Sequence, residues 1–109
     1  MLKTVVKRSG EKVPFDASKI RGAIFKANVR IATEKFSEAE LDRLTDEVVE
    51  AAGKLRTTPT VEQIQDIVEE KLIESDYAKT AKAYILYRAE HQKLREMDDE
   101  LVKIYSALT

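Results

Sequence analysis

The side chains with the clearest capacity for chemistry are cationic, and they gather near the start of the sequence. Residues 1–30 carry eight basic and two acidic side chains, a net charge of +6, whereas the remaining residues carry −7. A local basic patch on a nearly neutral chain suits a small, compact anion better than a long nucleic acid. The alternative is a solvated basic face that docks on the acidic remainder of the same chain.

Lys19 occupies a position where a cation is unfavourable unless an anion is nearby. Asp16 is expected to cap a helix, which puts Lys19 at the third helical position, next to the positive end of the helix dipole. Backbone N–H groups, the dipole and an ammonium at one helix end together favour a phosphate group. Lys7, Arg8 and Lys12 lie in the segment that leads into this helix, so we predict a phosphate site there. The alternative is that Lys19 simply extends into solvent.

The segment before this helix is expected to form a β-hairpin. Residues 4–8 and 11–15 flank Ser9-Gly10, a two-residue connection in which the glycine accepts a positive φ. A turn of this length places Lys7 directly opposite Lys12, and the two ammonium groups repel unless an anion lies beside them. An isolated hairpin is marginally stable, so this one must pack on helices.

Three helices are predicted from their first residues. Asp16 caps the first, and the other two begin with the capping boxes Ser37–Glu40 and Thr60–Gln63. Apolar residues follow each cap at helical spacing and are expected to form the core. They are Ile20, Ala23, Ile24 and Ala27, then Leu41, Leu44, Val48, Ala52 and Leu55, then Ile64, Ile67, Val68 and Leu72.

A fourth helix is expected from about Ser75-Asp76. No glycine or proline interrupts residues 77–108, which form either one long helix or two. In the second case the last helix begins near Asp98 and buries Leu101, Val102, Ile104, Tyr105 and Leu108. The sequence therefore predicts a mainly α fold in which a short β-hairpin lies over a small helical bundle.

Several classes of protein are excluded by what the sequence lacks. There is no cysteine and only one histidine, His91, so thiolate zinc sites, multi-histidine metal sites and thiol nucleophiles are ruled out. The three glycines stand apart at positions 10, 22 and 53, and they form no phosphate-binding loop of the Walker type. No apolar stretch approaches the ~20 residues of a membrane span, and no signal peptide is evident. We expect a soluble, cytoplasmic protein without catalytic residues.

Parts of the sequence resemble the ATP-cone domain, the nucleotide-sensing module at the N-terminus of ribonucleotide reductases. The stretches that carry the resemblance are residues 5–10, 13–20, 60–69 and 81–88. Residues 80–91 are most similar to the anaerobic, glycyl-radical class of reductase. The resemblance implies a nucleotide-binding regulatory domain over residues 1–92. Residues 93–109 would then be a helical extension or linker toward an absent catalytic domain.

The resemblance also implies a fold, a ligand and roles for residues at the site. The fold is a hairpin lid over a four-helix bundle with a C-terminal helical extension. The ligand is ATP or dATP with Mg2+, and the metal is held through the phosphates rather than by side chains. Lys7 and Arg8 correspond to residues that reach the phosphates from the lid, and Lys19 does so from the first helix. Asp16 corresponds to a position that helps to hold the sugar or base.

Other positions carry implied roles around the base. The backbone near Val5 and Val13 encloses it, and Thr60 lies near the nucleotide. Tyr84 and Tyr87, one helical turn apart, either pack on the adenine or are core tyrosines with surface hydroxyls. Arg88 either adds a phosphate contact or pairs with an acidic neighbour, and we favour the pairing.

The function implied is allosteric control of ribonucleoside-triphosphate reductase by ATP or dATP, through altered subunit association or substrate access. The implied partners are a reductase catalytic domain or subunit and a second copy in a homo-oligomer. We expect neither a membrane nor a nucleic acid as partner. The alternative is a helical oligomerisation module or DNA-binding regulator whose assembly is controlled by nucleotide.

Overall fold

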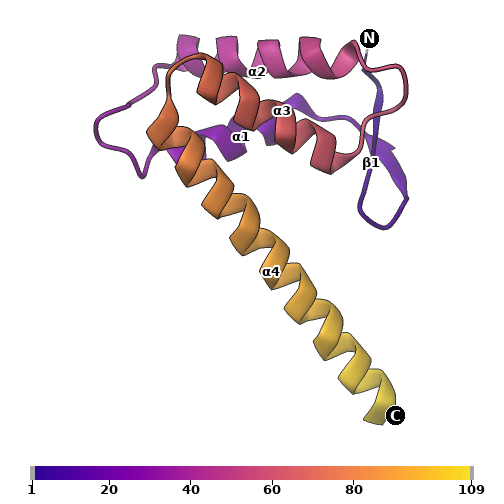
Figure 1. The fold of residues 1–109 in the computed structure, drawn as a ribbon. Coiled ribbons are helices and arrows are strands. Elements are labelled where there is room, and N and C mark those ends of the chain that lie inside the picture. The colour runs from indigo at the N-terminus through magenta and orange to yellow at the C-terminus, as the bar shows by residue number, and fades with distance from the viewer. Residues whose placement is uncertain (1, 109) are drawn as a thin grey trace.

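A computed structural model describes residues 2–108 as one antiparallel hairpin and four helices (Figure 1). The elements are β1 (Thr4–Val6), β2 (Lys12–Pro14), α1 (Ala17–Asn28), α2 (Glu38–Gly53), α3 (Val61–Glu74) and α4 (Ala78–Leu108). The predicted class, mainly α with a short β-hairpin, is confirmed. No helix among the described residues is both long enough and apolar enough to cross a membrane.

The hairpin has a different register from the predicted one. Val6 pairs with Lys12, and the same register continued by one residue sets Lys7 opposite Glu11, which leaves three residues, 8–10, in the turn rather than two. The Lys7 N–H donates to the Glu11 carbonyl at 2.8 Å, and the Gly10 N–H donates to the Lys7 carbonyl at 2.8 Å. Gly10 adopts a φ of 91°, which a three-residue loop of this kind requires at its last position. The predicted pairing of Lys7 with Lys12 is therefore wrong, and Lys7 lies level with Glu11.

The register decides whether Lys7 and Lys12 lie on the same face of the hairpin. Side chains alternate between the two faces of a strand, so a one-residue shift moves a side chain to the opposite face. In the observed pairing Val5 is opposite Val13. Lys7 shares the face of these two valines, which pack on the helices. Lys12 lies on the other face.

The three predicted helix caps are present. The Asp16 carboxylate accepts the Ser18 N–H at 3.0 Å, and the Ser37 hydroxyl accepts the Glu40 N–H at 3.1 Å. At Thr60 both bonds of the capping box form. The box at Ser37 is only half formed within the described chain, because the Glu40 carboxylate pairs with Arg43 and accepts the Tyr77 hydroxyl proton at 2.8 Å.

The apolar stripes of the first three helices meet in one core. Ile24, Leu44, Val48 and Leu72 are fully buried, and they come from α1, α2 and α3. The predicted core residue Leu55 lies beyond the end of α2 and is exposed. The helical bundle therefore provides a rigid base on which the hairpin and the first half of α4 pack.

A polar network joins α1 to the beginning of α4. The Asn28 side-chain amide donates to the Thr80 hydroxyl at 3.1 Å and accepts the Phe36 N–H at 2.9 Å. The Glu34 carboxylate accepts the Thr80 N–H and hydroxyl at 2.9 and 2.8 Å, and the Lys79 N–H at 3.3 Å. Burial alone would raise the pKa of Glu34, but these hydrogen bonds lower it below its usual value. Glu34 thus caps α4 from a distant loop.

The fourth helix is a single unbroken element of 31 residues. Its first half packs on the bundle, and the part of α4 beyond Glu96 projects away from the other elements (Figure 1). Of the two alternatives, one long helix is therefore correct, and the separate last helix that would bury its apolar residues is not present. Leu101, Val102, Ile104, Tyr105 and Leu108 are between 52% and 78% exposed. The expected boundary between residues 92 and 93 falls inside this helix.

Candidate functional site

The described residues line a half-open cavity of about 640 Å³ between the hairpin, α1, α3 and α4. This volume lies within the range of pockets that hold small organic ligands. Its wall combines an apolar floor with a few charged groups. Eight of the residues predicted to bind a ligand line it: Val5, Lys7, Val13, Asp16, Lys19, Tyr84, Tyr87 and Arg88.

Two lysines reach this cavity from different elements. Lys7 comes from the hairpin, on the face shared with Val5, and Lys19 comes from the first turn of α1. Neither ammonium is in an ion pair among residues 2–108. Both cations therefore remain available to an anionic ligand at the N-terminus of a helix, where the dipole also favours negative charge.

Asp16 is the acidic side chain in the wall of the cavity. Its Oδ1 accepts the Ser18 hydroxyl proton at 2.6 Å and the Ser18 N–H at 3.0 Å. Both bonds lower the pKa of Asp16, and the bond from the Ser18 hydroxyl has the larger effect. The carboxylate is thus held ionised and in a fixed position at the start of α1.

The arginines and the lysines of the basic segment, residues 1–30, differ in whether they form ion pairs. Among the described residues, each of its arginines pairs with an acidic side chain from the rest of the chain. Arg21 pairs with Glu38 and with Asp42, the latter at 2.8 Å, whereas the partners of Arg8 and Arg30 are on α4. Its lysines make no such pairs within residues 2–108. The docking interpretation of the basic patch therefore holds for its arginines, whereas anion binding by its lysines stays a prediction.

An aromatic row on α4 forms one wall. Tyr84 is buried, with only 3% of its surface exposed, and burial raises the pKa of its hydroxyl. The ring centroids of Tyr84 and Tyr87 are 6.4 Å apart, and the ring centroids of Tyr87 and His91 are 4.2 Å apart. Tyr84 therefore belongs to the core and to the cavity wall at once.

Arg88 combines the two roles considered for it. It lines the cavity, and its guanidinium donates to Asp66 at 2.7 Å and to Glu69 at 3.1 Å, both on α3. The preferred prediction, pairing with an acidic neighbour, is confirmed. The charge of Arg88 is therefore already compensated, whereas Lys7 and Lys19 have no acidic partner among the described residues.

Three of the predicted site residues lie outside this cavity. Lys12 is on the opposite face of the hairpin, because of the register described above. Arg8, in the hairpin loop, pairs with Glu96 of α4 at 3.4 Å and does not line the cavity. The Thr60 hydroxyl is occupied by the Gln63 N–H, although its backbone lies beside Val6 of β1.

Four further polar or aromatic residues line the cavity and were not predicted: Phe15, Gln65, His91 and Arg95. The spacing of His91 and Arg95 contained a usable signal. They follow Tyr84 by seven and eleven residues, which places them on the same face of one helix. Nothing in the local sequence of Phe15 distinguishes a side chain that lines the cavity from one that packs on the core.

Comparison with known proteins gives one family match. Residues 3–93 match the model described as the ATP cone domain. Over 101 residues the chain is 43% identical to the vitamin B12-dependent ribonucleoside-diphosphate reductase of Thermoplasma acidophilum, covering 88% of this chain and 13% of that protein. It is 34% identical over 92 residues to the anaerobic ribonucleoside-triphosphate reductase of Salmonella typhimurium. That match covers 84% of this chain and 12% of the reductase.

The chain spans only about an eighth of the length of these relatives. Because both vitamin B12-dependent and anaerobic reductases match, the similarity does not select the anaerobic class. Among the described residues there is no group of three histidine or acidic side chains that could hold a metal ion.

Proposed function

The chain belongs to the ATP-cone domain family, and from this premise we propose that it binds ATP or dATP as an allosteric regulatory domain of a ribonucleotide reductase. The observation that carries the proposal is the pair of unpaired lysines, Lys7 and Lys19, at one cavity with an aromatic wall. A triphosphate supplies the negative charge that these two cations lack.

The proposed orientation follows from the distribution of charge. The phosphates lie at the end of the cavity formed by Lys7 and Lys19, where the start of α1 adds its dipole. The adenine lies against Val5, Val13 and the tyrosines of α4, and Asp16 faces the sugar. Mg2+ arrives with the nucleotide and is held by phosphate oxygens, which suits a wall containing a single carboxylate.

Such a site favours reversible binding over hydrolysis. The described residues offer no general base in contact with the two lysines, and a sensor requires that its ligand leaves unchanged. We infer that the ligand acts by bridging the hairpin and α1. This contact changes how the hairpin and α4 present themselves to the catalytic part of a reductase, through altered association or substrate access. Such coupling requires that the ligand binds the two arrangements with different affinity.

Isothermal titration calorimetry with ATP and dATP tests the proposal. Binding of either nucleotide at micromolar concentration, with a matching rise in melting temperature, supports it. A ligand present at 100 times its dissociation constant should stabilise the fold by about 2.7 kcal/mol. GTP serves as the control for base recognition. If neither adenine nucleotide binds with Mg2+ present, the proposal fails.

A further inference from the structure

The cavity extends along α4 beyond the two tyrosines, to His91 and Arg95, which have no role in the orientation proposed above. Both residues line the cavity, and they follow Tyr84 and Tyr87 along one face of the helix. Tyr84 is buried, Tyr87 is half-buried, and His91 and Arg95 are exposed, so this wall runs from the core toward solvent. The helix rises by about 16 Å from Tyr84 to Arg95, which leaves room for a base, a sugar and a row of phosphates in line.

Arg95 carries a positive charge that nothing in the described chain compensates. No acidic side chain within residues 2–108 is paired with it. The adjacent Glu96 is engaged elsewhere, because its Oε1 accepts from the Arg8 guanidinium at 3.4 Å and from the Gln92 side-chain amide at 3.3 Å. Arg88, the other arginine in the cavity wall, is held by two carboxylates of α3. Arg95 is therefore the arginine of this wall whose charge remains available to a ligand.

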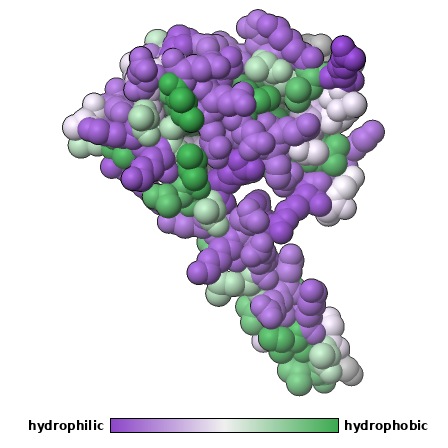
Figure 2. Space-filling view, in the orientation of Figure 1, coloured by the Kyte–Doolittle hydropathy of each residue, from purple (hydrophilic) through white to green (hydrophobic). Residues whose placement is uncertain are grey.

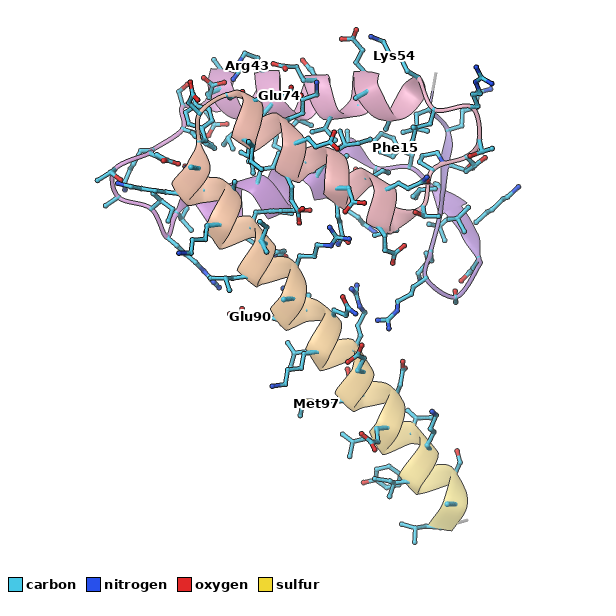
Figure 3. All side chains as sticks on the ribbon, in the orientation of Figure 1. Phe15, Arg43, Lys54, Glu74, Glu90 and Met97 are labelled. Carbon is cyan, nitrogen blue, oxygen red and sulfur yellow. The ribbon has the colours of Figure 1, made fainter. Side chains whose placement is uncertain are left out.

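The ion pair between Arg8 and Glu96 shows which end of the cavity Arg95 lies at. Arg8 directly follows Lys7 in the chain, and Glu96 directly follows Arg95. Because Arg8 and Glu96 are in contact, the hairpin loop and this turn of α4 lie next to each other. In Figure 3 residues 90–97, labelled at both ends, lie where α4 leaves the bundle, and Figure 2 shows mainly hydrophilic surface there. Arg95 thus lies at the same end of the cavity as Lys7.

We propose that Arg95 binds the terminal phosphate of the nucleotide and thereby selects a triphosphate over a diphosphate. The proposal rests on the proposed function, since it takes ATP or dATP as the ligand of the cavity. The adenine is placed against the tyrosines, and Arg95 is the cavity residue of α4 farthest from Tyr84, so the last phosphate of the chain is the one that reaches it. A guanidinium suits this role, because its forked donors can bind two oxygens of one phosphate.

The role proposed for Arg95 concerns this chain rather than its family. Residues 3–93 match the ATP cone domain, and Arg95 lies beyond them. With Arg95 in contact, a triphosphate would be held by Lys7 of the hairpin, Lys19 of α1 and a residue of α4 at the point where that helix leaves the bundle. A diphosphate lacks the last of these contacts. The number of phosphates is therefore sensed in α4.

Calorimetric titration of the whole 109-residue chain with ATP and with ADP tests the proposal. Both nucleotides are used with Mg2+ at pH 8, above the range in which histidine ordinarily carries a charge. Arg95→Gln should raise the dissociation constant for ATP about tenfold, because it removes a hydrogen bond between charged groups, and that for ADP by less than about twofold. Lys93→Gln is the matched control. It removes the same charge two residues away from a side chain that does not line the cavity, so both constants should stay within about twofold of the wild type.

Equal weakening of ATP and ADP binding by Arg95→Gln would overturn the assignment to the terminal phosphate, as would unchanged affinity for ATP. Equal effects of the Arg95 and Lys93 variants would overturn it as well. In each of these cases ATP still binds the wild-type chain, so the proposed function stands. A wild-type chain that binds neither ATP nor dATP would overturn both. Arg95 is exposed and unpaired within residues 2–108, and an unchanged thermal transition of the unliganded variant will confirm that it folds.

Hydrogen exchange provides a second measurement that does not depend on affinity. At saturating concentrations, ATP should slow exchange of the backbone amides of residues 91–97 in the wild-type chain more than ADP does, because only ATP contacts this turn of α4. The difference between the two nucleotides should disappear in Arg95→Gln and persist in Lys93→Gln. Equal slowing by ATP and ADP in the wild-type chain would contradict the proposed contact.

Discussion

Lys7 and Lys12 provide the most direct test of the proposed nucleotide site. Both are exposed lysines of the same hairpin, and the observed register places them on opposite faces. Lys7 lines the cavity, whereas Lys12 does not. We therefore expect Lys7→Ala to weaken binding of ATP strongly and Lys12→Ala to leave it nearly unchanged.

The expected magnitudes follow from the two kinds of interaction that are lost. Removing a hydrogen bond between an ammonium and a phosphate costs about 1.5–3 kcal/mol, which corresponds to a dissociation constant roughly 10- to 150-fold higher. A charge roughly 10 Å away through water contributes only about 0.4 kcal/mol before salt screens it. Lys12→Ala should therefore change the dissociation constant by less than about twofold. Lys19→Ala should resemble Lys7→Ala.

Calorimetric titration with ATP and Mg2+ near physiological ionic strength measures the difference. Neither lysine is in an ion pair among residues 2–108, so the unliganded variants should melt like the wild type. Equal losses of affinity in the Lys7 and Lys12 variants would refute the assignment of the two faces. Equal losses are the result that the predicted two-residue turn would give, because it places both lysines on one face of the hairpin.

The remaining predictions concern the contacts around the site and the core. Glu34→Gln should destabilise the fold by about 1–2 kcal/mol at pH 7, because it weakens the cap on α4. The lowered pKa of Glu34 gives stability that is present above its usual value of 4.5 and is lost as the pH falls through the folded value. Chemical denaturation of this variant should therefore show a smaller loss of stability below pH 4.5 than the wild type, and an identical loss would contradict the role of Glu34. Glu96→Gln frees Arg8 and should tighten ATP binding by at most about fivefold, measured by calorimetry, since an exposed pair contributes about 0–1 kcal/mol. Leu72→Ala should cost about 2–5 kcal/mol of unfolding free energy and Leu55→Ala less than about 1, because only Leu72 is fully buried; similar melting temperatures for the two variants would disprove this.

Local sequence signals predicted the helices well, because capping and helical spacing act over a few residues. Asp16, Ser37 and Thr60 each cap the helix expected to follow. The half-formed box at Ser37 shows the limit of such signals. Glu40 is at the expected position, but the Tyr77 hydroxyl, 37 residues away in sequence, competes for its carboxylate.

The turn at Ser9-Gly10 was located correctly in the sequence but given the wrong length. Either a two- or a three-residue loop can use a glycine with positive φ, so the local sequence does not distinguish them. The observed register brings Val5 and Val13 together on the face that packs on the helices. Packing therefore selected the three-residue loop, and with it the lysine that reaches the cavity.

The sequence by itself determined the mainly helical class, the caps, the basic segment and the family of the chain, because each depends on residue types at short or fixed spacing. The tertiary structure alone decided which lysines face the cavity, which arginines are neutralised by acidic partners, and which half of α4 is covered. Each of these depends on contacts between residues distant in sequence, such as Arg30 with Glu90 and Arg88 with Asp66. No local pattern encodes such contacts, since they arise only once the elements pack together.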